Sequence, residues 1–141
     1  MQKRAQMRSE IRPRYWHIVL CAIVGSAIFV FTDFAYMEKL GELPKLREIW
    51  WLTALVPALC GTVVTLGAGG APMWKRVIGA VACGGAVGVL YTAVSAILVY
   101  GGPIGVGDLV INCVWRVFIF SILSAIGMLL TEIALPEPKA V

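Results

Sequence analysis

The stretch from Asp108 to Thr131 most constrains the fold, because it is apolar for long enough to cross a lipid bilayer and yet contains Arg116. A membrane-spanning helix needs about 20 apolar residues, and a charged side chain inside such a helix is costly unless it is paired or functional. The rest of the chain must therefore surround this arginine with protein or with polar groups.

Three other apolar stretches are long enough to cross a bilayer, at about 15–36, 50–66 and 77–100, and the fourth span covers about 109–131. Of the 141 residues, 60% are hydrophobic and 14% are charged, whereas a soluble domain is about 45–50% apolar and about 25% charged. The sequence therefore predicts an all-α integral membrane protein, with four transmembrane helices in one small bundle over residues 15–135.

Three polar segments flank or interrupt the spans. Residues 1–14 are expected to form a basic cytoplasmic tail that Pro13 separates from the first span. Residues 37–49 have leucine or isoleucine at every third position, which favours a short amphipathic helix on the membrane surface over an ordinary solvated connector. Residues 136–141 are expected to be a short second tail.

The distribution of basic residues predicts the orientation. Four spans place both termini on one side, which collects eight basic residues: Lys3, Arg4, Arg8, Arg12, Arg14, Lys75, Arg76 and Lys139. The opposite side receives three, namely Lys39, Lys45 and Arg47. Because basic residues favour the cytoplasmic side, we expect an N-in, C-in, multi-pass protein of the bacterial inner membrane, with residues 37–49 outside.

Two charged residues of opposite sign lie at similar depth in this topology. Asp33 is near the outer end of the first span, and Arg116 is in the outer half of the fourth, so we expect them to form an intramembrane pair. The pair would fix the helix register. Alternatively, Arg116 would meet an anion, a lipid headgroup or an acidic group of a partner subunit.

Each of these residues belongs to a stripe of small and polar side chains. Asp108, Asn112 and Arg116 are spaced i, i+4, i+8 and share one helix face. The face continues inward, and the first span has a comparable stripe. We expect both stripes to face protein rather than lipid; their further members are Phe120, Ser124, Gly127 and Thr131 on the fourth span and Ala22, Gly25, Ser26 and Phe29 on the first.

Small residues also predict where helices approach one another. Gly84 and Gly88 form a GxxxG step in the third span, and Gly79 thins the same surface. We expect this span to lie at the centre of the bundle or against another subunit, with Gly25 and Gly127 as further packing positions. Pro57 is expected to kink the second span.

Composition also argues against several classes of function. The four cysteines lie singly in apolar runs, which is typical of packing residues, and His17 is the only histidine, so we expect no metal site and no cofactor. No paired carboxylates and no nucleophile beside a base are present, so we expect no enzyme. The net charge of +4 is concentrated at the N-terminus and indicates anionic lipid rather than nucleic acid.

The favoured hypothesis is a non-catalytic small subunit that packs against, and stabilises or docks, a larger membrane complex of transport or respiratory type. Its glycine surfaces and the segment 37–49 would make the contact. One alternative is a homo-oligomeric carrier or channel for an anionic solute that uses Arg116. The other is a membrane anchor of a redox complex, with haem or quinone at a shared interface.

In size and number of spans the chain is similar to the small four-span subunits of tripartite periplasmic carriers, a likeness of architecture without a shared motif. It lacks the central glutamate that the first span of small multidrug carriers contains.

Overall fold

The computed structural model consists of four helices, each long and apolar enough to cross a membrane. They are α1 (Gln2–Leu40), α2 (Trp50–Gly67), α3 (Met73–Leu98) and α4 (Val106–Ala134). The structure describes residues 2–41, 48–67, 71–98 and 105–135, with side chains from Trp16 onward, and contains no strand in these ranges. The prediction of an all-helical chain with four potential spans is confirmed, and it indicates a multi-pass integral membrane protein.

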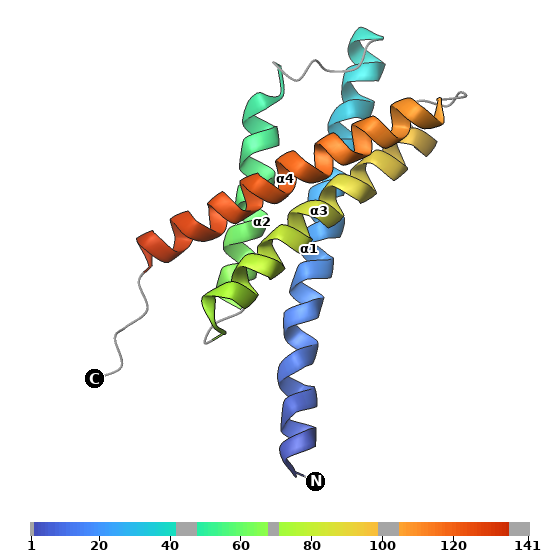
Figure 1. The fold of residues 1–141 in the computed structure, drawn as a ribbon. Helices are drawn as coiled ribbons and strands as arrows, with labels where there is room; N and C mark the ends of the chain where they lie inside the picture. Colours follow the sequence, from blue (N-terminus) through green and yellow to red (C-terminus); the bar gives the residue numbers. More distant parts are fainter. Residues whose placement is uncertain (1, 42–47, 68–70, 99–104, 136–141) are drawn as a thin grey trace.

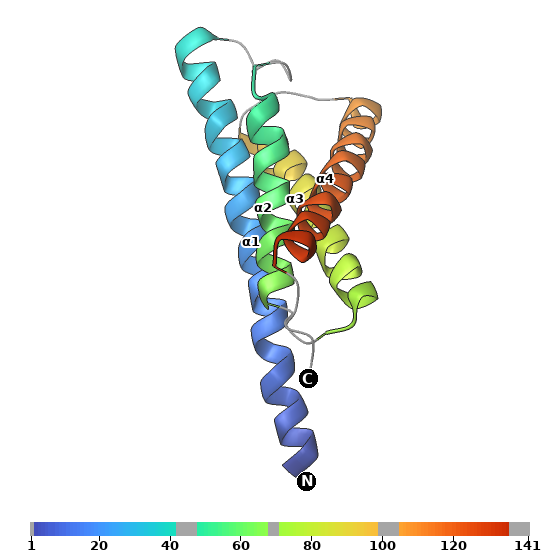
Figure 2. The same cartoon turned by 90° about the vertical axis from the view of Figure 1, so that its left-hand side faces the viewer.

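The helices run alternately up and down (Figure 1), so α1 begins and α4 ends at the same end of the bundle. We call this the terminal end. Helices α3 and α4 form a pair that crosses α1 obliquely (Figures 1 and 2). The backbone of α4 approaches α2 and α3 but not α1, whereas α2 and α3 each contact all three other helices. The third span therefore shares the central position that was expected for it with α2.

Helix α1 differs most from the prediction. It continues through Pro13 without the expected break and extends 39 residues to Leu40. A proline at position 13 leaves one carbonyl, that of Ser9, without its helical donor, whereas unwinding the helix there would free several backbone groups. The first part of α1 consequently projects beyond the other three helices at the terminal end (Figure 2).

The remaining boundaries change less. Residues 37–40 of the expected amphipathic segment belong to α1, and residues 42–47 lie outside the described residues. So do residues 99–100 of the third predicted span and the tail 136–141. Helix α2 continues through Pro57, which is fully buried, and the kink expected there stays a prediction.

The core is centred on three aromatic rings from three helices. Phe29 of α1 stacks on Tyr91 of α3 with ring centroids 5.0 Å apart, and on Phe120 of α4 at 4.9 Å. The outside of the bundle is apolar as well, as the 75% exposure of Phe31 illustrates. Lipid tails solvate such side chains, so contacts between the helices must come from close packing and hydrogen bonds.

Candidate functional site

Helix α4 is held against α2 by two glycines, one on each helix. A Cβ atom added to Gly127 would lie 2.1 Å from the carbonyl oxygen of Ala58, and one added to Gly61 would lie 1.9 Å from that of Ser124. Neither position has room for a methyl group. Gly127 was predicted, but Gly61 was missed, although it belongs to a buried i, i+4 row of small residues that includes Pro57 and Thr65.

The GxxxG step of α3 also faces α4. A Cβ atom on Gly84 would lie 2.3 Å from the Phe120 carbonyl oxygen, and one on Gly88 would lie 2.8 Å from the backbone nitrogen of Val117. The expectation that these glycines offer a surface to another subunit is therefore wrong, because α4 of the same chain already fills it. Gly79 and Gly25 make looser contacts, with ideal Cβ positions 3.1 Å from a Val64 methyl group and 3.2 Å from a Val87 methyl group.

Ser124 is fully buried beside these close contacts, and its hydroxyl has no hydrogen-bond partner among the described residues. The position requires a small side chain, because the α2 backbone at Gly61 lies against the carbonyl oxygen of Ser124.

Asp33 is buried at the centre of a polar cluster, with 2% of its surface exposed. The Tyr91 hydroxyl donates a hydrogen bond of 2.7 Å to Oδ2 of Asp33, and the Ser95 hydroxyl donates one of 3.2 Å to the same oxygen. Two donors from α3 therefore hold the carboxylate that α1 brings into the core.

Arg116 lies on the other side of Tyr91. Its guanidinium carbon is 4.0 Å from the centroid of the Tyr91 ring, and its Nη1 donates a long hydrogen bond of 3.4 Å to Oγ1 of Thr92. A cation over an aromatic face is attracted by the ring quadrupole. Tyr91 thus contacts the cation through its ring and the carboxylate of Asp33 through its hydroxyl.

The direct pair of Asp33 and Arg116 is therefore not formed. The structure records no ion pair between these two residues. The sequence predicted similar depths for the two charges but missed Tyr91 of α3, which contacts both. Which side chain lies between two others depends on the rotation of α3, which spacing in the sequence does not determine.

The stripe on α4 changes character along the helix. Phe120, Ser124, Gly127 and Thr131 are buried, as expected for a face that packs on protein. Asp108 and Asn112 are exposed, Arg116 is half-buried, and no residue from 106 to 119 is buried. The expectation that the whole stripe faces protein is wrong for its first part within this chain. Asn112 Nδ2 donates 2.9 Å to the Asp108 carbonyl of its own helix.

A second polar contact, at the terminal end, was not predicted. Arg76 of α3 is 9% exposed. Its Nε donates a hydrogen bond of 2.8 Å to the Ala71 carbonyl. Its Nη1 donates to Oε1 of Glu132 on α4, with which it forms an ion pair. The Thr131 and Thr62 hydroxyls are hydrogen-bonded nearby at 2.9 Å. The sequence did contain a signal, since the topology placed these opposite charges at one membrane surface.

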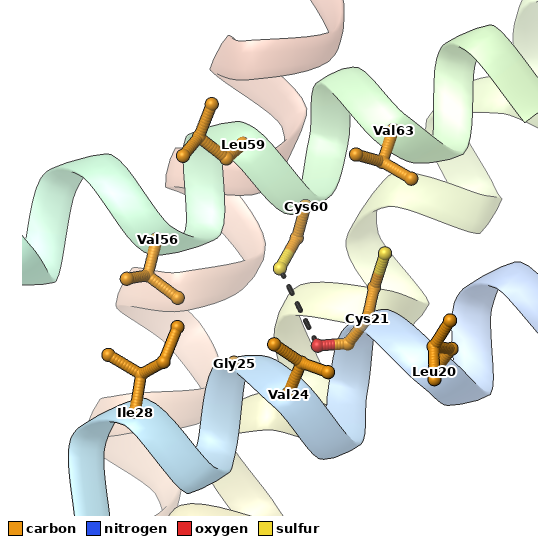
Figure 3. A pocket seen from close by; sticks show the side chains of 9 residues that line it. All are labelled: Leu20, Cys21, Val24, Gly25, Ile28, Val56, Leu59, Cys60 and Val63. Carbon is orange, nitrogen blue, oxygen red and sulfur yellow. Dashed lines mark hydrogen bonds between the residues drawn. The ribbon is translucent and has the colours of Figure 1, made fainter. Parts of the chain in front are cut away.

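The cysteines are free thiols, and Cys21 and Cys60 line an apolar groove of about 250 Å³ between α1 and α2 (Figure 3). The Cys60 thiol donates to the Cys21 carbonyl at 3.8 Å. Valine, leucine and isoleucine side chains make up most of the remaining lining, so the groove suits an alkyl chain better than a polar solute. Within the described ranges, no group of three or more His, Cys, Asp or Glu residues is arranged to hold a metal ion.

His17, the remaining candidate ligand, packs at the terminal end against Gly67, where an added Cβ atom would lie 3.2 Å from its ring.

No family model matches the chain, and comparisons with curated proteins and with solved structures found no significant similarity.

Proposed function

We propose that this chain is a non-catalytic subunit of a larger membrane complex, to which it docks through α4. The observation that carries the proposal is the open polar stripe of Asp108, Asn112 and Arg116 on the first half of a helix that is otherwise apolar enough to span the bilayer.

Lipid tails offer no hydrogen bonds, so an amide or guanidinium exposed to them is costly, whereas a neighbouring helix with polar groups satisfies it. The amide of Asn112 and the guanidinium of Arg116 lie about one and two helical turns past Asp108. A protein partner over this stripe would remove the cost. The glycine surfaces no longer support docking, because they are filled within the chain.

The proposal includes an orientation in which the terminal end of the bundle, with both termini, lies on the cytoplasmic side of a bacterial inner membrane. The excess of basic residues on that side supports it. Labelling of single cysteines introduced at Glu38 and at Lys139 with a membrane-impermeant thiol reagent in intact cells checks this. The cysteine at position 38 should react and the one at 139 should not, and the reverse pattern would contradict the orientation.

The main test is gentle detergent extraction from native membranes, followed by size determination and mass spectrometry. We expect a particle that contains a larger, different polypeptide in a constant ratio to this chain. A particle made only of this chain would refute the subunit hypothesis.

Arg116 also supports a second candidate, a homo-oligomeric carrier of an anionic solute, because its half-buried cation would line a path shared between copies. In that case Arg116→Ala in reconstituted vesicles should abolish anion flux while the oligomer stays intact. The redox-anchor hypothesis stays a prediction, and an absorption spectrum and quinone extraction of the purified particle check it.

A further inference from the structure

We infer that the partner seats a membrane-spanning helix on the first half of α4 and presents a carboxylate to Arg116 from within that helix. This inference rests on the proposed function, and it specifies the docking face and the chemistry of the group that contacts it.

Arg116 has hydrogen-bonding capacity that the described residues leave largely unused. A guanidinium has five N–H donors, and the structure records one bond from it, 3.4 Å long, to Thr92. Its guanidinium carbon is 4.0 Å from the centroid of the Tyr91 ring, and the ring offers no acceptor oxygen to the donors on the guanidinium edge. Asp33 does not use them, since it forms no ion pair with Arg116 and its Oδ2 accepts from Tyr91 and Ser95. The edge therefore lacks a strong acceptor among the described residues.

A carboxylate on a partner helix is the acceptor that best fits Arg116. A carboxylate matches the guanidinium edge with two parallel hydrogen bonds and neutralises its charge. A lipid phosphate would reach Arg116 from the end where α4 begins, about 15 Å away along the helix. On that route it would pass the carboxylate of Asp108, which lies on the same stripe and repels it. A carboxylate carried on a helix reaches the required depth without passing Asp108.

The α4 surface beside Arg116 includes two exposed apolar side chains. Ile111 and Trp115 adjoin the stripe on α4 and are 68% and 58% exposed. A partner helix that covers Arg116 would therefore cover these two side chains as well. The side-chain oxygen of Asn112 remains available to a donor of the partner, since its nitrogen already bonds to the Asp108 carbonyl.

Photo-cross-linking in native membranes tests the inference. Ile111 on α4 is replaced by p-benzoylphenylalanine, and Phe31, an equally open apolar position on α1 at 75% exposure, serves as the matched control. We expect the probe at Ile111, but not the one at Phe31, to join a different polypeptide, at a peptide that has Asp or Glu inside an apolar run.

Arg116→Gln should lower this adduct roughly tenfold or more, because the partner's carboxylate is left buried without its cation. Asn112→Leu, at an exposed position, should also lower it and serves if Arg116→Gln does not fold. Arg116→Glu, combined with arginine in place of the identified carboxylate, should restore the adduct. Failure of this exchange, or an adduct peptide without a carboxylate, would overturn the inference.

An adduct at Ile111 with lipid alone or with a second copy of this chain would also overturn it. If extraction yields a larger polypeptide and only the probe at Phe31 reaches it, docking through α4 is wrong, while the chain remains a subunit of a larger complex. If extraction yields this chain alone, the proposed function fails as well.

Discussion

The two halves of α4 have nearly the same length and opposite surroundings. From Phe120 to Ala134 five residues are buried, and the α2 backbone approaches so closely that Gly127 has no room for a methyl group. From Val106 to Ile119 no residue is buried, and Gly107 has no atom within 4 Å of an ideal Cβ. The second half packs on both α2 and α3, whereas the first half contacts α3 at Arg116 and Val117 and leaves Asp108 and Asn112 exposed.

The comparison also shows that polarity alone does not reveal the role of a residue in a membrane helix. Thr131 and Asn112 are both polar, but Thr131 bonds across to Thr62 of α2 whereas Asn112 bonds only within α4. The difference lies in burial, which decides whether a polar group stabilises the chain itself or remains for a partner.

The largest expected effect is that of a single methyl group in each half. Gly127→Ala should destabilise the purified chain by about 3 kcal/mol or more, because its Cβ would overlap the Ala58 carbonyl and force α2 and α4 apart. Gly107→Ala should leave stability unchanged or raise it by up to about 1 kcal/mol, since alanine is the better helix former. Unfolding by SDS titration in mild detergent measures both. Equal losses would show that the two halves do not differ in packing.

The ion pair at the terminal end should have the next largest effect. Glu132→Gln keeps the shape of the side chain but removes the negative charge that the nearly buried guanidinium of Arg76 contacts, so we expect a loss of about 2 kcal/mol. The exposed Glu38 serves as the control, and Glu38→Gln should change stability by less than about 0.5 kcal/mol. The same SDS titration applies, and an unchanged Glu132→Gln variant would remove this contact from the stabilising set.

A smaller effect is expected at Tyr91 of α3, which lies against Arg116 near the boundary between the two halves of α4. Tyr91→Phe removes the hydroxyl that donates to Asp33 but keeps the ring under Arg116, so the loss should be about 1 kcal/mol. The half-buried Tyr36 provides the matched control, because Tyr36→Phe should have little effect. If the two variants have the same stability, the link from Asp33 to Tyr91 is not formed in the membrane.

The smallest effect on the isolated chain is expected in the first half of α4. Asn112→Leu exchanges an exposed amide for an apolar side chain, so the free energy of unfolding in detergent should change by less than about 0.5 kcal/mol. The larger particle, in contrast, should dissociate more readily on extraction. A large loss of stability in the isolated chain would mean that this half is packed in the folded subunit after all.

Much of the helix arrangement was predictable, because length and hydropathy determine where a chain can cross a bilayer. Gly84, Gly88 and Gly127 were found from their small size, and the structure gives each a backbone neighbour. Comparing depths along the spans placed Asp33 and Arg116 in one region, but α3 connects them rather than a direct contact of α1 with α4.

What the sequence did not predict depends on helix rotation and crossing. Tyr91 lies between the two charges because α3 turns that face inward, and the pattern of small residues around it did not indicate this. Likewise, the i, i+8 spacing placed Asp108 and Arg116 on one face correctly. It gave no sign that α4 diverges from its neighbours before that face ends.

The unbroken course of α1 has a mechanical consequence. Its 39 residues extend about 58 Å, roughly twice the thickness of a hydrocarbon core. The part before Trp16 is then a lever of about 20 Å that continues the same helix through Pro13. A tilt of α1 by about ten degrees in the membrane moves the tip of that lever by about 3 to 4 Å, so a small rearrangement among the spans becomes a displacement in the aqueous phase.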